Sequence, residues 1–165
     1  MNQSVKSRAL LLYAAGLLTG LQAQAQAVSD DVVRIGVVTD MSGALADLSG
    51  TGSETAVRMA VEDFGGKVLG KRIEVLGMDH QNKPDVASSR VRAWFDQQKV
   101  DMITDLTNSA VALAAIGIAK EMNRVAIVNG AGTTRITNDS CSPLAVHWAW
   151  DTYAMANGTA KAILK

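Results

Sequence analysis

Apolar positions along the chain follow two different spacings. Short, near-continuous apolar runs rich in β-branched residues are typical of strands buried on both faces. They occur at residues 32–38, 72–78, 100–106 and 125–128, and a fifth run lies at 146–150. Between them, helical spacing predicts helices over residues 53–64, 85–97, 109–122 and 152–165. Strand and helix in alternation, joined by short loops, predict an α/β fold with a parallel sheet flanked by helices.

The helices differ in the faces they are expected to bury. In the first, one face consists of Ala56, Met59, Ala60 and Phe64, and a Gly65-Gly66 pair then ends the helix. In the second, the apolar face consists of Ala87, Val91, Trp94 and Phe95, so both aromatic rings are predicted to lie in the core. The third is apolar almost all round, which predicts a buried helix.

The first 27 residues have the order of a secretory signal peptide. Lys6 and Arg8 precede an apolar run at 9–21, and small residues at alternate positions lead to a predicted cleavage site after Ala27. The apolar run is shorter than the roughly 20 residues that a membrane-spanning helix needs. We therefore expect an exported, periplasmic protein.

Composition excludes several classes of protein. Basic and acidic side chains number 16 each, so there is no strongly basic footprint for nucleic acid. One cysteine excludes a disulfide scaffold and a multi-cysteine zinc site. Outside the cytoplasm Cys141 is expected to be either buried or paired with a cysteine beyond this sequence.

Candidate chemistry gathers in the loops that follow the predicted strands. In parallel α/β sheets, ligands bind outside the carboxyl ends of the strands. The loops after Val38, Leu106 and Val128 are rich in Gly, Ser, Thr and Asn, and they lead toward helix N-termini. Backbone N–H groups in such places suit an anionic group such as a carboxylate.

No motif of the sequence supports catalysis, a cofactor or a metal. Residues 65–72 (GGKVLGKR) match GxxxxGK, but they lack the following Ser or Thr and join a helix to a strand, the reverse of a P-loop. Residues 130–135 (GAGTTR) lack the third glycine of a dinucleotide fingerprint, and there is no GxSxG elbow. Asp79 and His80 are interpreted as a solvated loop pair, and His147 as a packing histidine. We predict that the protein is not an enzyme.

Four ordered segments resemble a known family. They are VRIGVVTDMSG, KVLGKRIEVLGMDHQNKPDVA, VDMITDLTNSA and VAIVNGAGTTRITNDSCSP. The chain from about Val33 onward resembles the leucine-binding-protein family, the periplasmic solute-binding proteins of branched-chain amino acid type ABC transporters. The resemblance implies a type I periplasmic binding protein that traps a small carboxylate ligand between two lobes and delivers it to an ABC permease in the inner membrane.

The resemblance also implies a domain organisation. Residues 28–150 would form the first lobe, and residues 151–165 would begin the second, most of which is missing. The last residues lie within an amphipathic helical pattern without a stop signal, so we expect the sequence to be a fragment.

Binding residues follow from the same resemblance, position by position. The carboxylate-binding loop after the third strand falls on Thr107, Asn108 and Ser109, and the backbone N–H groups of Ser109 and Ala110 would face the ligand. The loop after the fourth strand falls on Ala131, Gly132 and Thr133. Leu48 would line the pocket wall, and Tyr153 would lie near the crossover between lobes. Trp150, which with Tyr153 flanks Asp151, could also face the cleft. In amino-acid binders of the family, the acid that holds the ligand's amino group comes from the second lobe.

Three alternatives remain open. A ligand-sensing receptor ectodomain shares this fold, and would need a transmembrane helix and a signalling domain downstream. A truncated, non-functional copy would expose its interlobe surface. An exported α/β enzyme would need a nucleophile–base pair or a metal set, which the sequence does not offer.

Overall fold

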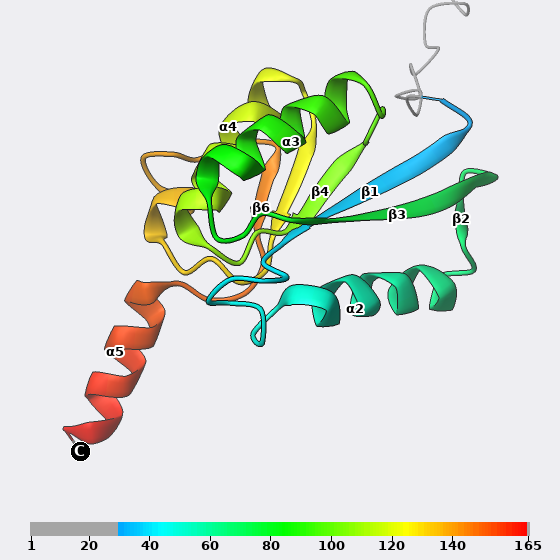
Figure 1. The fold of residues 1–165 in the computed structure, drawn as a ribbon. Coiled ribbons are helices and arrows are strands. Elements are labelled where there is room, and N and C mark those ends of the chain that lie inside the picture. The colour runs from blue at the N-terminus through cyan, green and yellow to red at the C-terminus, as the bar shows by residue number, and fades with distance from the viewer. Residues whose placement is uncertain (1–29, 165) are drawn as a thin grey trace, which may run out of the picture.

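The computed structural model describes residues 30–164, so the predicted signal peptide lies outside the described residues. These residues form one six-stranded sheet with helices on both faces (Figure 1). The strands are β1 (Val32–Thr39), β2 (Lys67–Val68), β3 (Lys71–Asp79), β4 (Met102–Asp105), β5 (Val125–Val128) and β6 (Ala145–His147). The helices are α2 (Gly50–Asp63), α3 (Pro84–Asp96), α4 (Ser109–Glu121) and α5 (Thr152–Ile163), with a 3₁₀ turn η1 (Thr134–Thr137).

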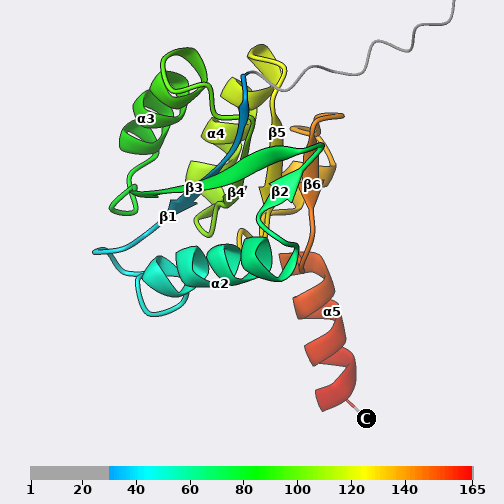
Figure 2. The same ribbon diagram turned by 90° about the vertical axis from the view of Figure 1, so that its right-hand side faces the viewer.

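The sheet is doubly wound, in the order β2-β3-β1-β4-β5-β6. The connection from β1 to β3 runs toward one edge of the sheet, whereas the connections from β3 to β4 and from β4 to β5 run toward the other. Because such connections are right-handed, α2 lies on one face of the sheet and α3 and α4 lie on the other, as Figures 1 and 2 show. Five strands are parallel, as predicted. The exception is β2, an antiparallel hairpin partner of β3 that the sequence did not reveal. The direction of winding reverses between β1 and β4, which is where ligands bind in such sheets.

The core lies between the sheet and the α3–α4 layer. The predicted face of α3 is buried, with Trp94 3% and Phe95 2% exposed. Gly36 in β1 lets the indole lie directly on the strand, because a Cβ there would approach a Trp94 ring carbon to 2.5 Å. α4 is buried along most of its length, as its composition predicted. Its buried residues are Val111, Ala112, Ala115, Ile116, Ile118 and Ala119.

The predicted inner face of α2 is wrong. Met59 and Phe64 are 59% and 66% exposed, and Val57 and Val61 are half-buried instead. Two polar anchors on the sheet side of the helix set its rotation. Ser53 donates to Asp105 Oδ1 over 3.2 Å, and the Arg58 guanidinium donates to the Val75 carbonyl oxygen over 3.0 Å.

Two strands end earlier than the apolar pattern predicts. β4 stops at Asp105 because Asp105 and Leu106 both adopt positive φ, 79° and 56°, where an extended strand cannot continue. β6 covers Ala145–His147 rather than 146–150, and Trp148 and Trp150 leave the sheet with exposures of 75% and 44%.

The chain leaves the sheet through α5. Asp151 caps this helix by accepting from the Ala154 N–H over 2.7 Å. Helix α5 has no buried residues and extends away from the body (Figure 1). No helix within residues 30–164 is long and apolar enough to cross a membrane.

Candidate functional site

A cavity of about 240 Å³ opens at the carboxyl ends of the central strands. The loops after β1, β4 and β5 contribute to it, as the sequence predicted, together with the start of α2 and the chain before α5. Its lining residues are Leu48, Ser49, Ser53, Asp105, Thr107, Asn129, Gly130 and Trp150. The cavity therefore occupies the switch point of the sheet.

The loop after β1 is folded around a buried carboxylate. Asp40 is fully buried, and its oxygens accept from the N–H groups of Gly43 (2.7 Å) and Leu45 (2.9 Å). The Ser49 hydroxyl, at the end of this loop, accepts from Thr39 Oγ1 over 3.1 Å. These bonds hold Leu48 and Ser49 at the cavity mouth.

Asp79, at the end of β3, ties the same loop to the neighbouring strand. It accepts from the Met41 N–H (2.9 Å), the Ser42 hydroxyl (2.5 Å) and the Gln81 N–H (2.8 Å). Partial burial alone would raise the pKa of the Asp79 carboxyl, but these hydrogen bonds outweigh burial and lower the pKa below its usual value.

His80 is not the solvated loop residue that the sequence suggested. It is fully buried, and its Nδ1 accepts from the Asn82 N–H over 3.0 Å. That bond assigns the proton of the neutral ring to Nε2, which has no hydrogen-bond partner within the described residues. Burial lowers the pKa of His80, although the charges of Asp40, Asp79 and Asp105 oppose the shift.

Asp105 forms the polar floor of the cavity. Its side chain is almost entirely buried, at 6% exposure, and Oδ1 accepts from the hydroxyls of Ser53 (3.2 Å) and Thr107 (3.1 Å). Oδ2 has no partner among the described residues. Nearby, Asn129 Oδ1 accepts from Thr104 Oγ1 over 3.2 Å.

The predicted carboxylate loop lies beside the cavity rather than in its wall. Asn108 caps α4, because its Oδ1 accepts from the N–H groups of Ala110 (2.8 Å) and Val111 (3.0 Å). Its amide nitrogen donates to Asn82 Oδ1 over 2.5 Å. Ser109 is half-buried and Ala110 is exposed. The Asn108 side chain therefore already accepts a hydrogen bond from the Ala110 N–H, a group that the sequence predicted would bind the ligand.

The second predicted loop holds the segment that leads from β6 into α5. The Ala131 carbonyl oxygen lies 2.6 Å from His147 Nε2, and the Gly132 carbonyl oxygen accepts from the Thr152 N–H over 2.7 Å. Thr133 caps the η1 turn. A Cβ on Gly132 would lie 2.4 Å from a ring carbon of Trp150, so this glycine lets the indole pack at the cavity edge.

Of the predicted site residues, Leu48 and Thr107 line the cavity. Tyr153 lies on α5, 69% exposed and outside the cavity wall. The sequence singled out three of the contributing loops, and Trp150 as a residue that could face a cleft. It did not single out Ser49, Ser53, Asp105, Asn129 or Gly130. The available signal was their position within one or a few residues of a strand end or helix start.

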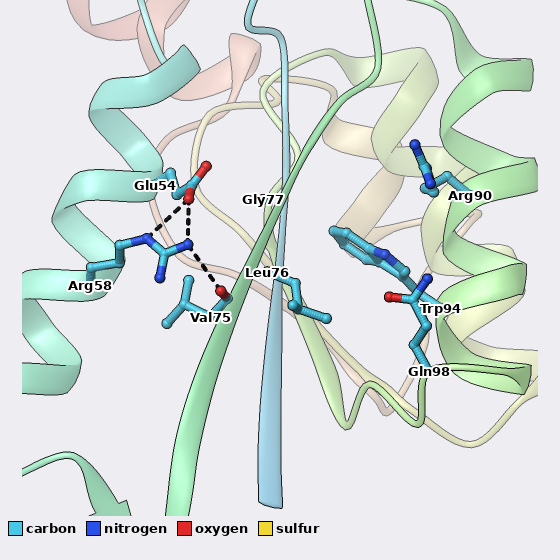
Figure 3. Close-up of a pocket in the computed structure, with 8 residues that line it drawn as sticks. All are labelled: Glu54, Arg58, Val75, Leu76, Gly77, Arg90, Trp94 and Gln98. Carbon is cyan, nitrogen blue, oxygen red and sulfur yellow. Dashed lines mark hydrogen bonds and ion pairs between the residues drawn. The ribbon is translucent and has the colours of Figure 1, made fainter.

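A second hollow, of about 390 Å³, lies along the outer flank of β3 (Figure 3). It runs between Glu54 and Arg58 of α2 on one side and Arg90, Trp94 and Gln98 on the other. Arg58 is already engaged there by Glu54 and by the Val75 carbonyl oxygen. Because this hollow sits against the middle of a strand, away from the carboxyl ends, we do not assign the ligand to it.

Comparison with known families identifies the family of the chain. A family model described as "Periplasmic binding protein" matches residues 32–165. The chain belongs to this family. A comparison with curated proteins finds no match.

Solved structures of this periplasmic binding protein family superpose on the chain. One from Burkholderia mallei is 50% identical, with a TM-score of 0.79, and the alignment covers 81% of this chain and 36% of that one. A branched-chain amino acid ABC transporter ligand-binding protein from Burkholderia xenovorans LB400 is 37% identical, with a TM-score of 0.76 and coverages of 80% and 35%.

A third relative was solved with a ligand. The solute-binding protein of an ABC transporter from Rhodopseudomonas palustris BisB5, in complex with 3,4-dihydroxybenzoic acid, is 28% identical. Its TM-score is 0.66, and the alignment covers 78% of this chain and 37% of that one. The chain therefore spans a little over a third of the length of these relatives, and its fold is that of one lobe of a type I periplasmic binding protein.

The family consists of binding proteins, which agrees with the interpretation of the sequence. Within residues 30–164 no group of three or more His, Cys, Asp or Glu side chains is placed to hold a metal ion. Cys141 is exposed, so it is not the buried thiol that the sequence left open as one alternative.

Proposed function

We propose that this chain is the first lobe of a periplasmic solute-binding protein that captures a small carboxylate ligand for an ABC permease. The observation that supports this most is the cavity at the switch point of the sheet, next to the place where the chain leaves toward α5. A cavity open on this side suits a ligand held between two lobes, with residues 151–165 beginning the second.

Two ligand classes come from the relatives. One relative is described as a branched-chain amino acid transporter protein, and another was solved with an aromatic acid. We infer that the ligand here is an amino acid or an aromatic or other organic acid. Asn108, Ser109, Ala110, Ala131, Gly132 and Thr133 are proposed to border it, with Leu48 and Tyr153 at the edges. No catalysis is proposed, because capture needs only directed hydrogen bonds in a closing cleft.

Isothermal titration tests the proposal on the protein produced from its own gene. Amino acids and aromatic acids are titrated, and saturable one-to-one binding of at least one carboxylate is expected. Ser109→Ala should weaken that binding, and Thr137→Ala, an exposed hydroxyl on the η1 turn, is the matched control. Unchanged affinity in Ser109→Ala would remove Ser109 from the site, whereas no binding of any carboxylate would refute the proposed function.

A further inference from the structure

The polar floor of the cavity described above presents hydrogen-bond acceptors around Asp105. Of its eight lining residues one, Asp105, is charged, and it is an anion. The hydroxyls of Ser53 and Thr107 both donate their protons to Asp105 Oδ1, so their lone pairs are what they can offer to a ligand.

Asp105 itself is held in a form that requires explanation. Its φ of 79° is uncommon for a residue other than glycine, and such strain gathers at binding sites. The residue is 6% exposed, and its buried Oδ2 has no partner within the described residues. Buried carboxylate oxygens are normally hydrogen-bonded, because an unpaired one keeps its full desolvation cost.

We propose that Asp105 is a specificity-determining residue, which accepts a hydrogen bond from an N–H or O–H donor group of the ligand. This inference rests on the proposed function and adds to it. The ligand carries a donor, an ammonium or a hydroxyl group, besides its carboxylate, and the donor end lies in this lobe against Asp105. The carboxylate of the ligand lies away from Asp105, since two anions in one small cavity repel each other.

The proposal differs from what the family resemblance implied. There, the acid that holds an amino group belongs to the second lobe, whereas Asp105 stands at the end of β4 in the first. The residue also explains why the cavity gathers hydroxyls around a carboxylate rather than a cradle of free N–H groups. Nearby, Asn108 already occupies the N–H groups of Ala110 and Val111.

Matched probes test the proposal, again on the protein produced from its own gene. Leucine and 3,4-dihydroxybenzoate carry both groups. 4-Methylpentanoate and benzoate keep the carboxylate and lack the donor, and 3-methylbutylamine and catechol keep the donor and lack the carboxylate. Comparing the amine probes with the phenol probes shows whether the donor group is an ammonium or a hydroxyl. Titration calorimetry gives the dissociation constant of each probe.

The wild-type protein should bind the better of the two complete probes at least about tenfold more tightly than its donor-free analogue, because a hydrogen bond to a charged group discriminates by about that factor or more. Asp105→Asn should remove most of this preference, and it should not weaken the donor-free analogue, because the change also removes the repulsion between Asp105 and the carboxylate of the probe. Asp47→Asn is the control, since it removes the same charge from an exposed residue outside the cavity wall.

The outcomes separate this inference from the proposed function. If the acids with and without a donor group bind equally well, the proposed role of Asp105 is wrong, and the proposed capture of a carboxylate ligand stands. Binding of the donor-only probes alone, weakened by Asp105→Asn, would keep Asp105 and overturn carboxylate capture. No binding of any probe would overturn both. The comparison of probes on the wild-type protein needs no variant, so it decides the question even if Asp105→Asn does not fold.

Discussion

The sheet face beneath α3 and α4 and the carboxyl edge of the same sheet are built in opposite ways. The face is apolar and regular, with Val38, Val91 and Ile103 fully buried in extended or helical backbone. At the edge, only one or two residues further along the strands, Asp40 and Asp105 are just as deeply buried but polar. Burial of the apolar face stabilises the fold. That stability offsets the cost of the strained backbone and the unpaired polar atoms at the carboxyl edge.

Removing Trp94 should have the largest effect, because it takes the largest buried aromatic side chain out of the regular face. Trp94→Ala deletes a buried indole that lies on Gly36, and we expect a loss of about 3–5 kcal/mol in the free energy of unfolding. Urea denaturation followed by circular dichroism measures it. Trp148→Ala is the control, since this tryptophan is 75% exposed and its loss should change stability by no more than about 0.5 kcal/mol. Similar losses in both variants would contradict the contrast.

Adding one carbon atom at Gly36 tests the same contact from the other side. Gly36→Ala places a Cβ 2.5 Å from a Trp94 ring carbon, so overpacking should cost about 1–3 kcal/mol of stability. Gly117→Ala in α4 is the matched control, because its Cβ meets nothing within 4 Å and alanine should stabilise the helix by about 0.5–1 kcal/mol. Denaturation of both variants is compared. If Gly36→Ala leaves the free energy of unfolding unchanged, the Trp94 indole can shift without a cost in stability.

The two regions also differ in how far the sequence predicts them. The face follows from periodicity, since Trp94 and Phe95 recur at helical spacing with Ala87 and Val91 and are buried as expected. The edge does not, because periodicity is silent about a buried His80 or about positive φ at Asp105 and Leu106. Those features arise from contacts between segments far apart in the chain, such as the bond from Ser53 to Asp105.

Helix α2 lies between these two cases. Its existence and its stop at Gly65-Gly66 were predicted, and both glycines adopt positive φ of 93° and 69°. Its rotation was not, because small and apolar residues occur on more than one side of it and polar anchors decide which side faces the sheet. The site shows the same limit. The sequence selects loops that border the cavity, but it does not show that the Asn108 side chain accepts from the helix N–H groups while Asp105 lines the cavity.

Asn108 tests a capping role against a ligand-binding role within one loop. Asn108→Ala removes an N-cap that accepts from two backbone N–H groups, so a loss of about 1 kcal/mol in stability is expected. Asn108→Asp retains the accepting oxygen and should recover the capping part of that stability, but not the bond that the Asn108 amide donates to Asn82 Oδ1. Thermal unfolding without ligand measures the cap, and ligand titration measures the site. If Asn108→Ala lowers affinity and leaves the melting temperature unchanged, the side chain serves the ligand rather than the helix.

The smallest effect is expected from the titration of His80, and its sign follows from burial. Burial lowers the pKa of His80 below the ordinary value of 6.5, with Asp40, Asp79 and Asp105 opposing the shift. The unfolded chain therefore binds a proton at pH values where the folded protein does not, so stability falls as the pH drops through about 6.5 and levels off below the folded-state pKa.

His80→Asn isolates that term, because the asparagine oxygen can accept from the Asn82 N–H in place of Nδ1, and the side chain does not titrate. Urea denaturation at about pH 7.5 and pH 5.5 should show a loss of stability toward acid in the wild-type protein and a smaller loss in His80→Asn. His147→Asn is the control, since His147 is only half-buried. An equal loss in wild type and His80→Asn would mean that the carboxyl edge tolerates a charged imidazole. The contrast between an apolar face and an edge that buries polar groups at a cost in stability would then fail at His80.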